Sequence, residues 1–468
     1  MISSSLFTLF AARRIKRSLM NMTGSRLVFA GLVSLLLMSG CSDSSTAQKP
    51  ADVLKVAGVD ETTFEFYYQD YFDLVYPDLP VELVAMGDIY QDKDPIKAYK
   101  QLIEKEKPDI IILPSAYYSP LADQGLLEDL TGWMSRSDMA ETDYQPGAIA
   151  MLKDNEENKI YGLAPSYDSS LLYYNADLFK QYGIDPPTSG MTWKELLQLS
   201  YRFKQAGGGI VGYHDPWMQD LNALIFDTLN GTEGLQLVDW QRGIHLLDTP
   251  AWHDLLQTAV EAVRNGSIAI KGVEVRVEDG GSWIDEGAIE KQDLFAKGKA
   301  AMAIDMYGNR SRFDQSKFAW SAVLPPVNSA TRESGGYMRM DGVFSISASS
   351  AFKEEAWKII QFIGSERAAK VISKTDGGLS IRRSGLQFNT NPLAAVAFEQ
   401  KPTLNAIDFT DRRDFYLNEN AMVQKELQIV LQGKQSLDAA IQTMQKQGQA
   451  FVDAFVKKNK ADEEKTEP

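Results

Sequence analysis

The sequence predicts an α/β protein built around mainly parallel sheets, and three observations lead to this fold class. Short apolar runs alternate with amphipathic segments from residue 53 onward, which is the pattern of strands joined by helices. One run, residues 109–113, is apolar almost throughout, as expected for a strand that is buried on both faces. No internal repeat with a period of about 20–50 residues is visible, which excludes a solenoid or a propeller.

Composition places the chain among ordinary globular proteins. Its 468 residues are 44% hydrophobic and 24% charged, which suits two or three domains and excludes a mainly disordered protein. The net charge of −15 argues against a nucleic acid as partner, because its phosphate backbone is also negative. One cysteine and three histidines leave no basis for a disulfide framework or for a Cys- or His-based metal site, so no cofactor is expected.

The first elements follow one another in strand–helix order. Residues 53–58 form a short apolar run that predicts a strand. In residues 64–75, aromatic side chains recur at spacings of three and four, which predicts a helix that ends before Pro77 and Pro80. Residues 81–84 alternate apolar and polar side chains and predict the second strand.

The pattern then continues through the middle of the chain. A charged helix is expected at 96–107, before the buried strand at 109–113, and Thr192 and Glu195 form a capping box that starts a helix to about residue 205. The region 217–265 has a mostly helical pattern. Further strands are expected at 159–165, 171–175, 299–304 and 342–346, and helices dominate from 353 to the end.

The N-terminus has the pattern of an export signal. Residues 1–40 hold five basic residues and no acidic one, and Leu27–Met38 form an apolar stretch that is too short to span a bilayer. Small residues follow directly before Cys41, the only cysteine, in the manner of a bacterial lipobox, so we expect Cys41 to carry a lipid such as palmitate. The alternative is that Cys41 is a buried structural cysteine.

The rest of the chain then lies outside the cytoplasm, held at the cell membrane by lipid only. Residues 41–50 are expected to be a flexible tether and 457–468 a disordered tail. Removal of residues 1–40 leaves 43 basic against 63 acidic residues, a net charge of −20.

Four stretches of the sequence, taken together with their order along the chain, resemble extracellular solute-binding protein family 1. Its members are the substrate-binding lipoproteins of bacterial ABC transporters, most of them for sugars. The resemblance covers about residues 52–385. It rests on the segments Pro108-Asp109 with Leu121–Leu130, Tyr161–Pro165 with Leu172–Phe179, Gly183–Pro187 and Thr192–Leu196, Gly298–Ala303, and Gly342–Ser349 with Glu354–Trp357.

This resemblance implies a two-lobed, periplasmic-binding-protein-like (type II) fold whose chain crosses a hinge three times. The crossings map near Ala164–Ser166, Asp305–Tyr307 and Val343–Ser345. Lobe 1 would then comprise 51–165 plus 306–343, and lobe 2 would comprise 166–305 plus 344–456.

A sugar ligand offers hydroxyl edges and apolar ring faces, so its site needs planar hydrogen-bonding groups and flat aromatic surfaces. Open α/β sheets bind ligands beyond the carboxyl ends of their strands, and most candidates therefore follow predicted strands or precede the third crossing. The resemblance implies an aromatic stacking residue in the second lobe, and Trp217 and Trp283 are the candidates there because loop-like residues flank them. The candidate ligand-binding residues are Asp60, Thr63, Ser115, Tyr117, Tyr167, Asp168, Trp217, Trp283, Asp305, Tyr307, Arg339 and Asp341.

Each candidate also has a structural alternative. The polar residues can act as helix caps or turn formers, and one of Tyr117 and Tyr118 is expected to pack while the other stays solvated. Arg339 and Asp341 can clamp a ligand or pair with each other across a turn. Trp240 is expected to be structural.

Two motifs carry no function in this sequence. Gly207–Gly212 satisfies GxGxxG, but a helix precedes it where a dinucleotide site needs a strand, so it predicts a helix end and a loop. The acidic stretch 88–94 lacks the glycine and the final glutamate of a calcium loop.

The sequence thus predicts a monomeric, lipid-anchored, non-enzymatic component of an ABC importer that captures a sugar, expected to be an oligosaccharide, by hinge closure and delivers it to permease subunits. Two alternatives stay open. One is a surface glycosidase with a carboxylate pair, and the other is a sensor of the same fold that presents its ligand to a receptor.

Overall fold

The structure is a computed structural model. It describes residues 53–466 apart from a few short segments, and the segments outside the description are 88, 90, 91, 93, 155, 156, 219, 271–274, 279, 280, 285–290, 334, 341, 376, 377 and 404–411. The expected signal segment, Cys41 and the tether lie outside the described residues.

A first sheet of five strands has the order β2-β1-β3-β15-β4. Strands β1, β2 and β3 run parallel, and β15 runs antiparallel to both β3 and β4. All four residues of β3 are buried, as the apolar run predicted. The strands are β1 (Leu54–Ala57), β2 (Val81–Leu83), β3 (Ile110–Leu113), β4 (Gly162–Leu163) and β15 (Val343–Ile346).

A second sheet has the order β13-β5-β12-β6-β9, with β14 and β16 also paired to β5. Its parallel part is β12, β6 and β9, while β5 runs antiparallel to β12 and β13. The strands are β5 (Ser166–Asn175), β6 (Val211–His214), β9 (Ile268–Ala269), β12 (Ala300–Met306), β13 (Trp320–Val323), β14 (Met338–Arg339) and β16 (Leu379–Ser380).

Two small antiparallel hairpins lie outside these sheets. They are β7 (Val238–Asp239) with β8 (Ile244–His245), and β10 (Val275–Glu278) with β11 (Gly281–Ile284). The first hairpin interrupts a region for which the sequence predicted a mostly helical pattern.

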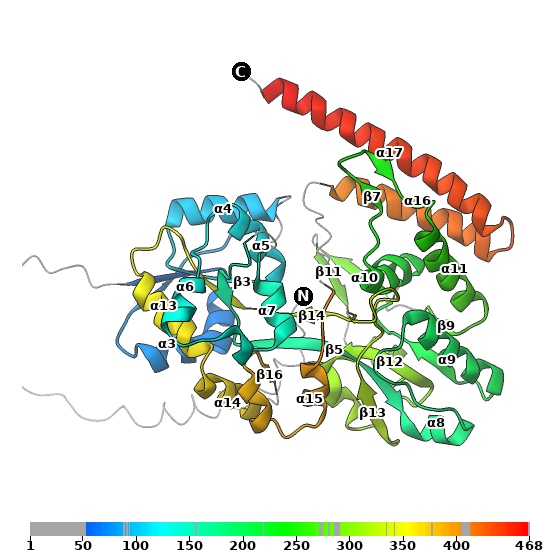
Figure 1. The fold of residues 1–468 in the computed structure, drawn as a ribbon, viewed down its shortest axis with the longest axis horizontal. Helices are drawn as coiled ribbons and strands as arrows, with labels where there is room; N and C mark the ends of the chain where they lie inside the picture. The colour runs from blue at the N-terminus through cyan, green and yellow to red at the C-terminus, as the bar shows by residue number, and fades with distance from the viewer. Residues whose placement is uncertain are drawn as a thin grey trace, which may run out of the picture. The chain divides into compact units, whose positions relative to one another are not determined.

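Helices surround each sheet, and we call each sheet with its helices a lobe (Figure 1). In the first lobe, the predicted aromatic helix is one continuous run whose middle turn is a π-helix. The first-lobe helices are α2 (Glu61–Thr63), the π-helix η1 (Phe64–Tyr68), α3 (Gln69–Val75), α4 (Pro95–Glu106), α5 (Ser115–Asp123), α6 (Thr131–Arg136), η3 (Glu141–Asp143), α7 (Pro146–Leu152), α13 (Lys353–Ile363), α14 (Glu366–Thr375) and η6 (Arg383–Phe388).

The second lobe has its own helices, and one buried core lies wholly within it, whereas the core of the first lobe extends to second-lobe residues such as Leu171 and Tyr173. The predicted capping box is present at the start of α9, where the Thr192 and Glu195 side chains each bind the other residue's backbone N–H. These helices are α8 (Ala176–Tyr182), α9 (Trp193–Ala206), the π-helix η4 (Ala223–Leu229), α10 (Asn230–Glu233), α11 (Pro250–Arg264), the 3₁₀-helix η5 (Tyr307–Phe313), α15 (Leu393–Phe398), α16 (Arg413–Leu431) and α17 (Leu437–Thr466).

The structure corrects the lobe boundaries expected from the sequence. The segment 306–343, expected in the first lobe, contains β13 and β14, which both pair with β5 of the second sheet. The segment after it begins with β15, which pairs with β3 and β4 of the first sheet. The cause is local: after β12 the segment that contains η5 carries the chain back to the other side of β5, where β13 runs in the same direction as β12 instead of leaving the lobe.

The observed passages between the sheets therefore differ from the expected ones. The first lies between β4 and β5, near residue 165, as expected. The second lies between β14 and β15, at 340–342, and not at Asp305–Tyr307. After α14 the chain goes over to the second lobe in steps: β16 pairs with β5, η6 still packs on α14, and α15, α16 and α17 then contact elements of the second lobe.

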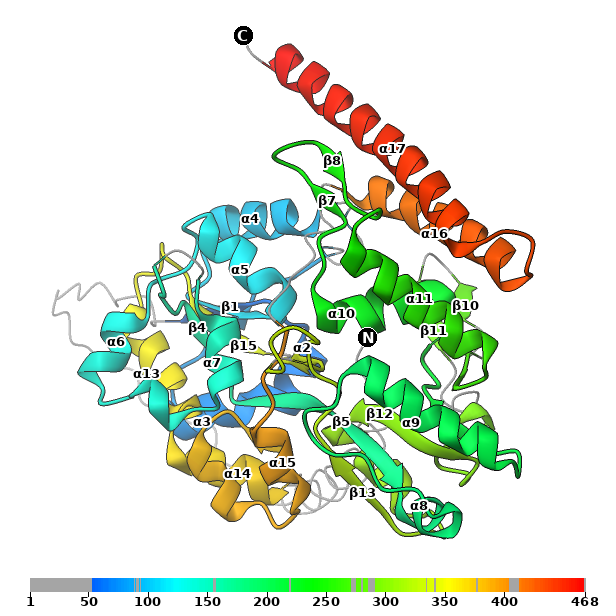
Figure 2. The same ribbon diagram turned by 45° about the vertical axis from the view of Figure 1, so that its right-hand side comes forward.

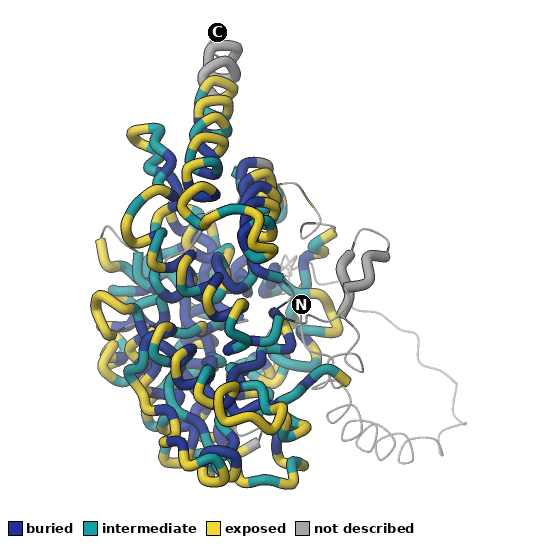
Figure 3. Tube along the Cα trace, turned by 90° about the vertical axis from the view of Figure 1, so that its right-hand side faces the viewer, coloured by how far each residue is buried: buried dark blue, intermediate teal, exposed yellow. Residues whose placement is uncertain are grey.

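The C-terminal helices α16 and α17 lie side by side, and α17 continues beyond the rest of the second lobe (Figure 2). A fully buried pair of polar side chains fastens them: His245 Nε2 of β8 lies 2.9 Å from Glu419 Oε1 of α16, and both side chains have 0% exposure. His245 Nδ1 lies 3.1 Å from Gln445 Oε1 of α17. Buried residues alternate with exposed ones along α17, as an amphipathic helix requires (Figure 3).

Among the residues that the structure describes, we find no helix with the length and apolarity needed to cross a membrane.

Candidate functional site

The polar candidates of the second lobe gather at one edge of its sheet. The parallel strands β12 and β6 end at this edge, and the antiparallel strand β5 begins there. Register divides the edge into two faces, because side chains alternate along each strand. We call face A the side on which Leu172, Met302 and Tyr213 pack into the second core, and face B the side on which Leu171 and Tyr173 pack.

On face A, Asp168 of β5 lies between two neighbouring strands. Its Oδ1 accepts a 3.0 Å hydrogen bond from the Gly308 N–H, directly after β12. Across β5, Arg339 of β14 is its register partner, and Arg339 Nη2 lies 4.0 Å from Asp168 Oδ2. Their side chains keep 21% and 33% exposure, so the pair is available to a ligand as a planar, charged hydrogen-bonding surface.

Asp215 and Trp217 lie on the turn that follows β6. The Asp215 Oδ1 atom accepts a 2.8 Å hydrogen bond from the Trp217 N–H, which fixes the turn. The Trp217 side chain is 42% exposed, one of the few large hydrophobic side chains with such exposure. Burial raises the pKa of Asp215 to about 7, and the nearby Asp305 carboxylate adds to the shift.

On face B, Asp305 belongs to a buried charge cluster that already satisfies it. Arg312 Nη1 lies 2.6 Å from Asp305 Oδ2, and Arg312 Nη2 also contacts Asp293 Oδ2. Asn309 Nδ2 and the Met306 N–H both donate to Asp305 Oδ1, at 2.7 and 2.8 Å. Burial raises the pKa of Asp305 although Arg312 opposes the shift. This geometry favours the structural alternative for Asp305.

Tyr167 and Tyr307 are buried as well, with 5% and 1% exposure. The Tyr307 ring is covered by the Arg310 guanidinium, 4.0 Å from the ring centre, and its hydroxyl lies 3.4 Å from Asn389 Oδ1. Desolvation raises the pKa of both phenols. The Tyr167 hydroxyl has no hydrogen-bond partner among the described residues, which leaves it as a buried polar atom that a ligand or a water could satisfy.

In the first lobe, Asp60 and Thr63 form a helix cap. Asp60 is the N-cap of α2, and its two carboxylate oxygens accept from the Thr63 N–H at 2.9 Å and from the Thr63 hydroxyl at 2.7 Å. The Thr63 hydroxyl bond is the main reason that the pKa of Asp60 is lowered. Asp60 is exposed, so the cap leaves its outer side open to solvent.

Ser115 and the tyrosines behind it start α5, directly after β3. The Ser115 N–H donates to the Met340 carbonyl at 3.2 Å, which brings the start of α5 next to the residue that follows Arg339. Tyr118 is the packed member of the tyrosine pair: its hydroxyl donates to the Leu152 carbonyl at 2.7 Å. Tyr117 is half-buried and lies against Tyr99, with 5.5 Å between ring centres.

Three candidates lie outside what the structure describes: Cys41, Asp341 and the side chain of Trp283. Trp240 is structural, as expected, because its ring contacts Phe415 and Phe455 at 5.0 and 5.1 Å.

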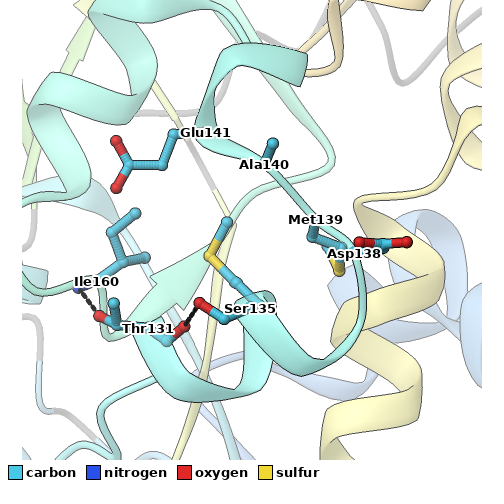
Figure 4. Close-up of a pocket in the computed structure, with 8 residues that line it drawn as sticks. Thr131, Ser135, Asp138, Met139, Ala140, Glu141 and Ile160 are labelled. Carbon is cyan, nitrogen blue, oxygen red and sulfur yellow. Dashed lines mark hydrogen bonds between the residues drawn. The ribbon is translucent and has the colours of Figure 1, made fainter.

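Two cavities in the first lobe do not coincide with face A. One, of about 750 Å³, runs along β2 between Asp60 and Met86 and is lined only by residues 59–87. The other, of about 360 Å³, lies beside α6 (Figure 4). Two of its polar side chains are already hydrogen-bonded, since the Thr131 hydroxyl accepts from the Ile160 N–H and the Ser135 hydroxyl donates to the Thr131 carbonyl. In the described part of the chain, no group of three or more His, Cys, Asp or Glu side chains could hold a metal ion.

Sequence reasoning missed three residues of this edge. Asp215 lies two residues before the candidate Trp217 and directly after the strand β6. The sequence did not predict β6, because this strand comes directly after a glycine-rich loop. Gly308 acts through its N–H, which no side-chain pattern reports. Arg312 pairs with Asp305 from within η5, a 3₁₀-helix that was not expected.

Comparison with known proteins decides the family. The sequence profile of the bacterial extracellular solute-binding proteins matches residues 57–370, about two thirds of the chain. The chain belongs to this family. Among curated relatives, the sn-glycerol-3-phosphate-binding periplasmic protein UgpB of Shigella flexneri is 23% identical over 335 residues, which cover 69% of this chain and 74% of UgpB.

Solved structures agree on the fold of this solute-binding protein. The sugar-binding protein MalE of Xanthomonas citri superposes with a TM-score of 0.61 at 17% identity and covers 86% of this chain and 98% of its own. A substrate-binding protein of Listeria monocytogenes, in complex with cycloalternan, has a TM-score of 0.54 at 18% identity, with coverage of 85% and 97%. These likenesses confirm the two-lobed periplasmic-binding-protein fold that the sequence predicted.

Proposed function

We propose that this solute-binding protein is the substrate-binding component of an ABC importer and that it captures a sugar, an oligosaccharide, at face A of the second lobe. The observation that carries the proposal is the Asp168–Arg339 pair, half-buried at the edge where β5, β12 and β14 meet. Planar charged groups of this kind bind vicinal hydroxyls through directed hydrogen bonds. The exposed Trp217 ring supplies an apolar surface for a sugar ring.

The charges at this edge favour a neutral ligand over an anion. Two acidic side chains, Asp168 and Asp215, lie on this side of the edge, while the guanidinium of Arg339 already faces Asp168 and that of Arg312 is paired with the buried Asp305. A phosphate ester would bring another negative charge toward these oxygens, which costs Coulomb energy at short range. A hydroxylated ligand can donate hydrogen bonds to the same oxygens, so the arrangement supports a sugar.

Capture would proceed by hinge closure. The chain passes between the lobes near residue 165, at 340–342 and after α14, so a ligand on face A can gain contacts from α2 and α5 of the first lobe when the lobes approach. Asp60, Thr63, Ser115 and Tyr117 are the proposed first-lobe contacts. A ligand shifts the equilibrium between open and closed forms only as far as it binds the closed form more tightly than the open one.

We also propose that the protein is a monomer anchored through a lipid on Cys41 after removal of residues 1–40, and that it passes its ligand to permease subunits. The apolar stretch and the small residues before Cys41 support this proposal. Replacing Cys41 with Ser should prevent incorporation of labelled palmitate and release the protein from the membrane fraction. Incorporation into Cys41→Ser protein would contradict it.

We propose no catalytic step. A glycosidase would need one acidic residue kept protonated beside an ionised one, at the sugar. Asp215, with its pKa near 7, is the residue that keeps this alternative testable. A sensor of the same fold would bind the same ligand and differ only in its membrane partner.

The test is a titration of intrinsic tryptophan fluorescence with mono- and oligosaccharides, followed by chromatography of the recovered sugar. We expect a saturable change with one sugar class and recovery of that sugar intact. Cleaved sugar would establish the glycosidase alternative. Saturation by glycerol 3-phosphate, an amino acid or a polyamine in place of any sugar would overturn the proposed ligand class.

A further inference from the structure

Among the large hydrophobic residues that the structure describes, Tyr337 has the highest exposed fraction, 60%. A tyrosine ring left in water forgoes the burial that such a large apolar surface normally gains. Exposure alone assigns no role, because scattered surface hydrophobics are common. The position of Tyr337 in the sheet is what distinguishes it.

Tyr337 lies opposite Ser170 in the ladder between β14 and β5. Its N–H donates to Ser170 Oγ, and the Ser170 N–H donates to its carbonyl, both at 2.8 Å. The next pairs are Met338 with Ser169 and Arg339 with Asp168. Because side chains alternate along a strand, Tyr337 falls on the same side of the ladder as Arg339 and Asp168, and Met338 falls on the buried side.

The backbone that carries the ring is fixed on both sides. Before it, the Gly335 N–H donates to the Lys401 carbonyl at 3.0 Å, and a Cβ at Gly335 would meet the backbone of Pro326. After it, β14 joins β5. A ring held in this way loses little backbone freedom when a ligand binds, which is the condition for an efficient contact surface.

We infer that Tyr337 is a specificity-determining residue whose ring stacks on the apolar face of a sugar ring held by Asp168 and Arg339. The inference rests on the proposed function and deepens it, because it names a ligand with a flat ring face. A ligand without such a face would gain the polar contacts of Asp168 and Arg339 but not the stacking.

The test measures the dissociation constant of the sugar that binds wild-type protein, for Tyr337→Phe, Tyr337→Leu and Tyr337→Ala. We expect Phe to bind within about twofold of wild type, and Leu and Ala to bind about tenfold more weakly, since only the aromatic variants present a flat ring. Leu417→Ala, which truncates another exposed hydrophobic side chain on α16 (57% exposure), should leave the affinity unchanged.

Two results would overturn the inference while the proposed function stands. If Leu and Ala bind as tightly as wild type, the ring does not contact the ligand. If Phe loses as much affinity as Ala, the hydroxyl and not the ring makes the contact. If wild-type protein binds no sugar at all, the proposed function itself fails, and the inference fails with it. A thermal melt of each variant separates a lost contact from a lost fold.

Discussion

The Gly308 N–H donates a 3.0 Å hydrogen bond to the carboxylate of Asp168, and this contact joins the exit of β12 to the start of β5. A Cβ at Gly308 would lie 2.8 Å from Asp168 Oδ2, and backbone atoms are not among its nearest neighbours. Residue 308 therefore determines where the Asp168 carboxylate lies.

Gly308→Ala should weaken ligand binding about tenfold with little change in melting temperature. The new methyl group displaces a movable carboxylate rather than backbone, so the fold can adjust while the ligand contact cannot. Calorimetric titration and a thermal melt measure the two effects. Gly132→Ala in α6, where a Cβ meets nothing within 4 Å, is the matched control and should change neither. Unchanged affinity in Gly308→Ala would show that Asp168 does not hold the ligand.

Arg312→Met should destabilise the fold by about 3–5 kcal/mol, since it leaves two buried carboxylates, Asp293 and Asp305, without their cation. Urea denaturation measures this loss. As a control, Arg332→Met breaks an exposed pair with Glu195 and should cost less than about 1 kcal/mol. Equal costs for the two variants would contradict a buried structural cluster on face B.

Asp215 should make the ligand-free protein less stable as pH rises from about 4 to about 7. Its pKa is near 7 in the folded state and about 3.9 in unfolded chains, so in this interval the folded state holds a proton that the unfolded state has lost. The contribution of Asp215 to the free energy of unfolding is greatest below pH 4. It falls as the pH rises to about 7 and then no longer changes.

Asp215→Asn removes this titration together with its coupling to Asp305, so the difference from wild type reports the Asp215 carboxyl and its interactions. The urea midpoint of the variant should exceed that of wild type by more at pH 8 than at pH 4.5. A difference that is the same at both pH values would mean that the pKa of Asp215 is not raised.

His245→Ala should cost about 3 kcal/mol or more, because it leaves the Glu419 carboxylate buried without a partner. The loss should appear first as protease sensitivity of α16 and α17, which the pair joins to β8. The double variant His245→Ala with Glu419→Ala should recover part of the loss, since no charge then remains buried. As a contrast, Lys194→Ala, from an exposed pair with Asp254, should have little effect. A double variant no more stable than the single one would argue against a charge penalty.

Much of the fold could be predicted from the sequence, because its signals are local. The apolar run at 110–113 gave a buried strand, and Thr192 with Glu195 gave a capped helix start. The lobe boundaries were wrong after β12, because the 3₁₀-helix η5 and the short strand β13 carry no strong sequence pattern. Strand pairing across about 130 residues, as between β5 and β12, is a tertiary property.

The candidate site was predictable only in part, because strand order is a local signal whereas strand pairing is not. Position after a strand selected Asp168, Asp305 and Tyr307 together, yet a strand ends with alternate side chains on opposite faces. Register then placed Asp168 on face A and Asp305 in a buried cluster with Arg312. Sequence gives the order of these residues, whereas the face depends on which strand lies beside them.

The most direct test of the account is the calorimetric dissociation constant of wild-type protein for oligosaccharides, measured beside Asp168→Asn. We predict saturable one-to-one binding in the micromolar range, about −8 kcal/mol, and binding at least about tenfold weaker in the variant, with the same melting temperature in both. Absence of heat with every sugar, or equal affinity in the two proteins, would contradict sugar capture at this edge of the second sheet.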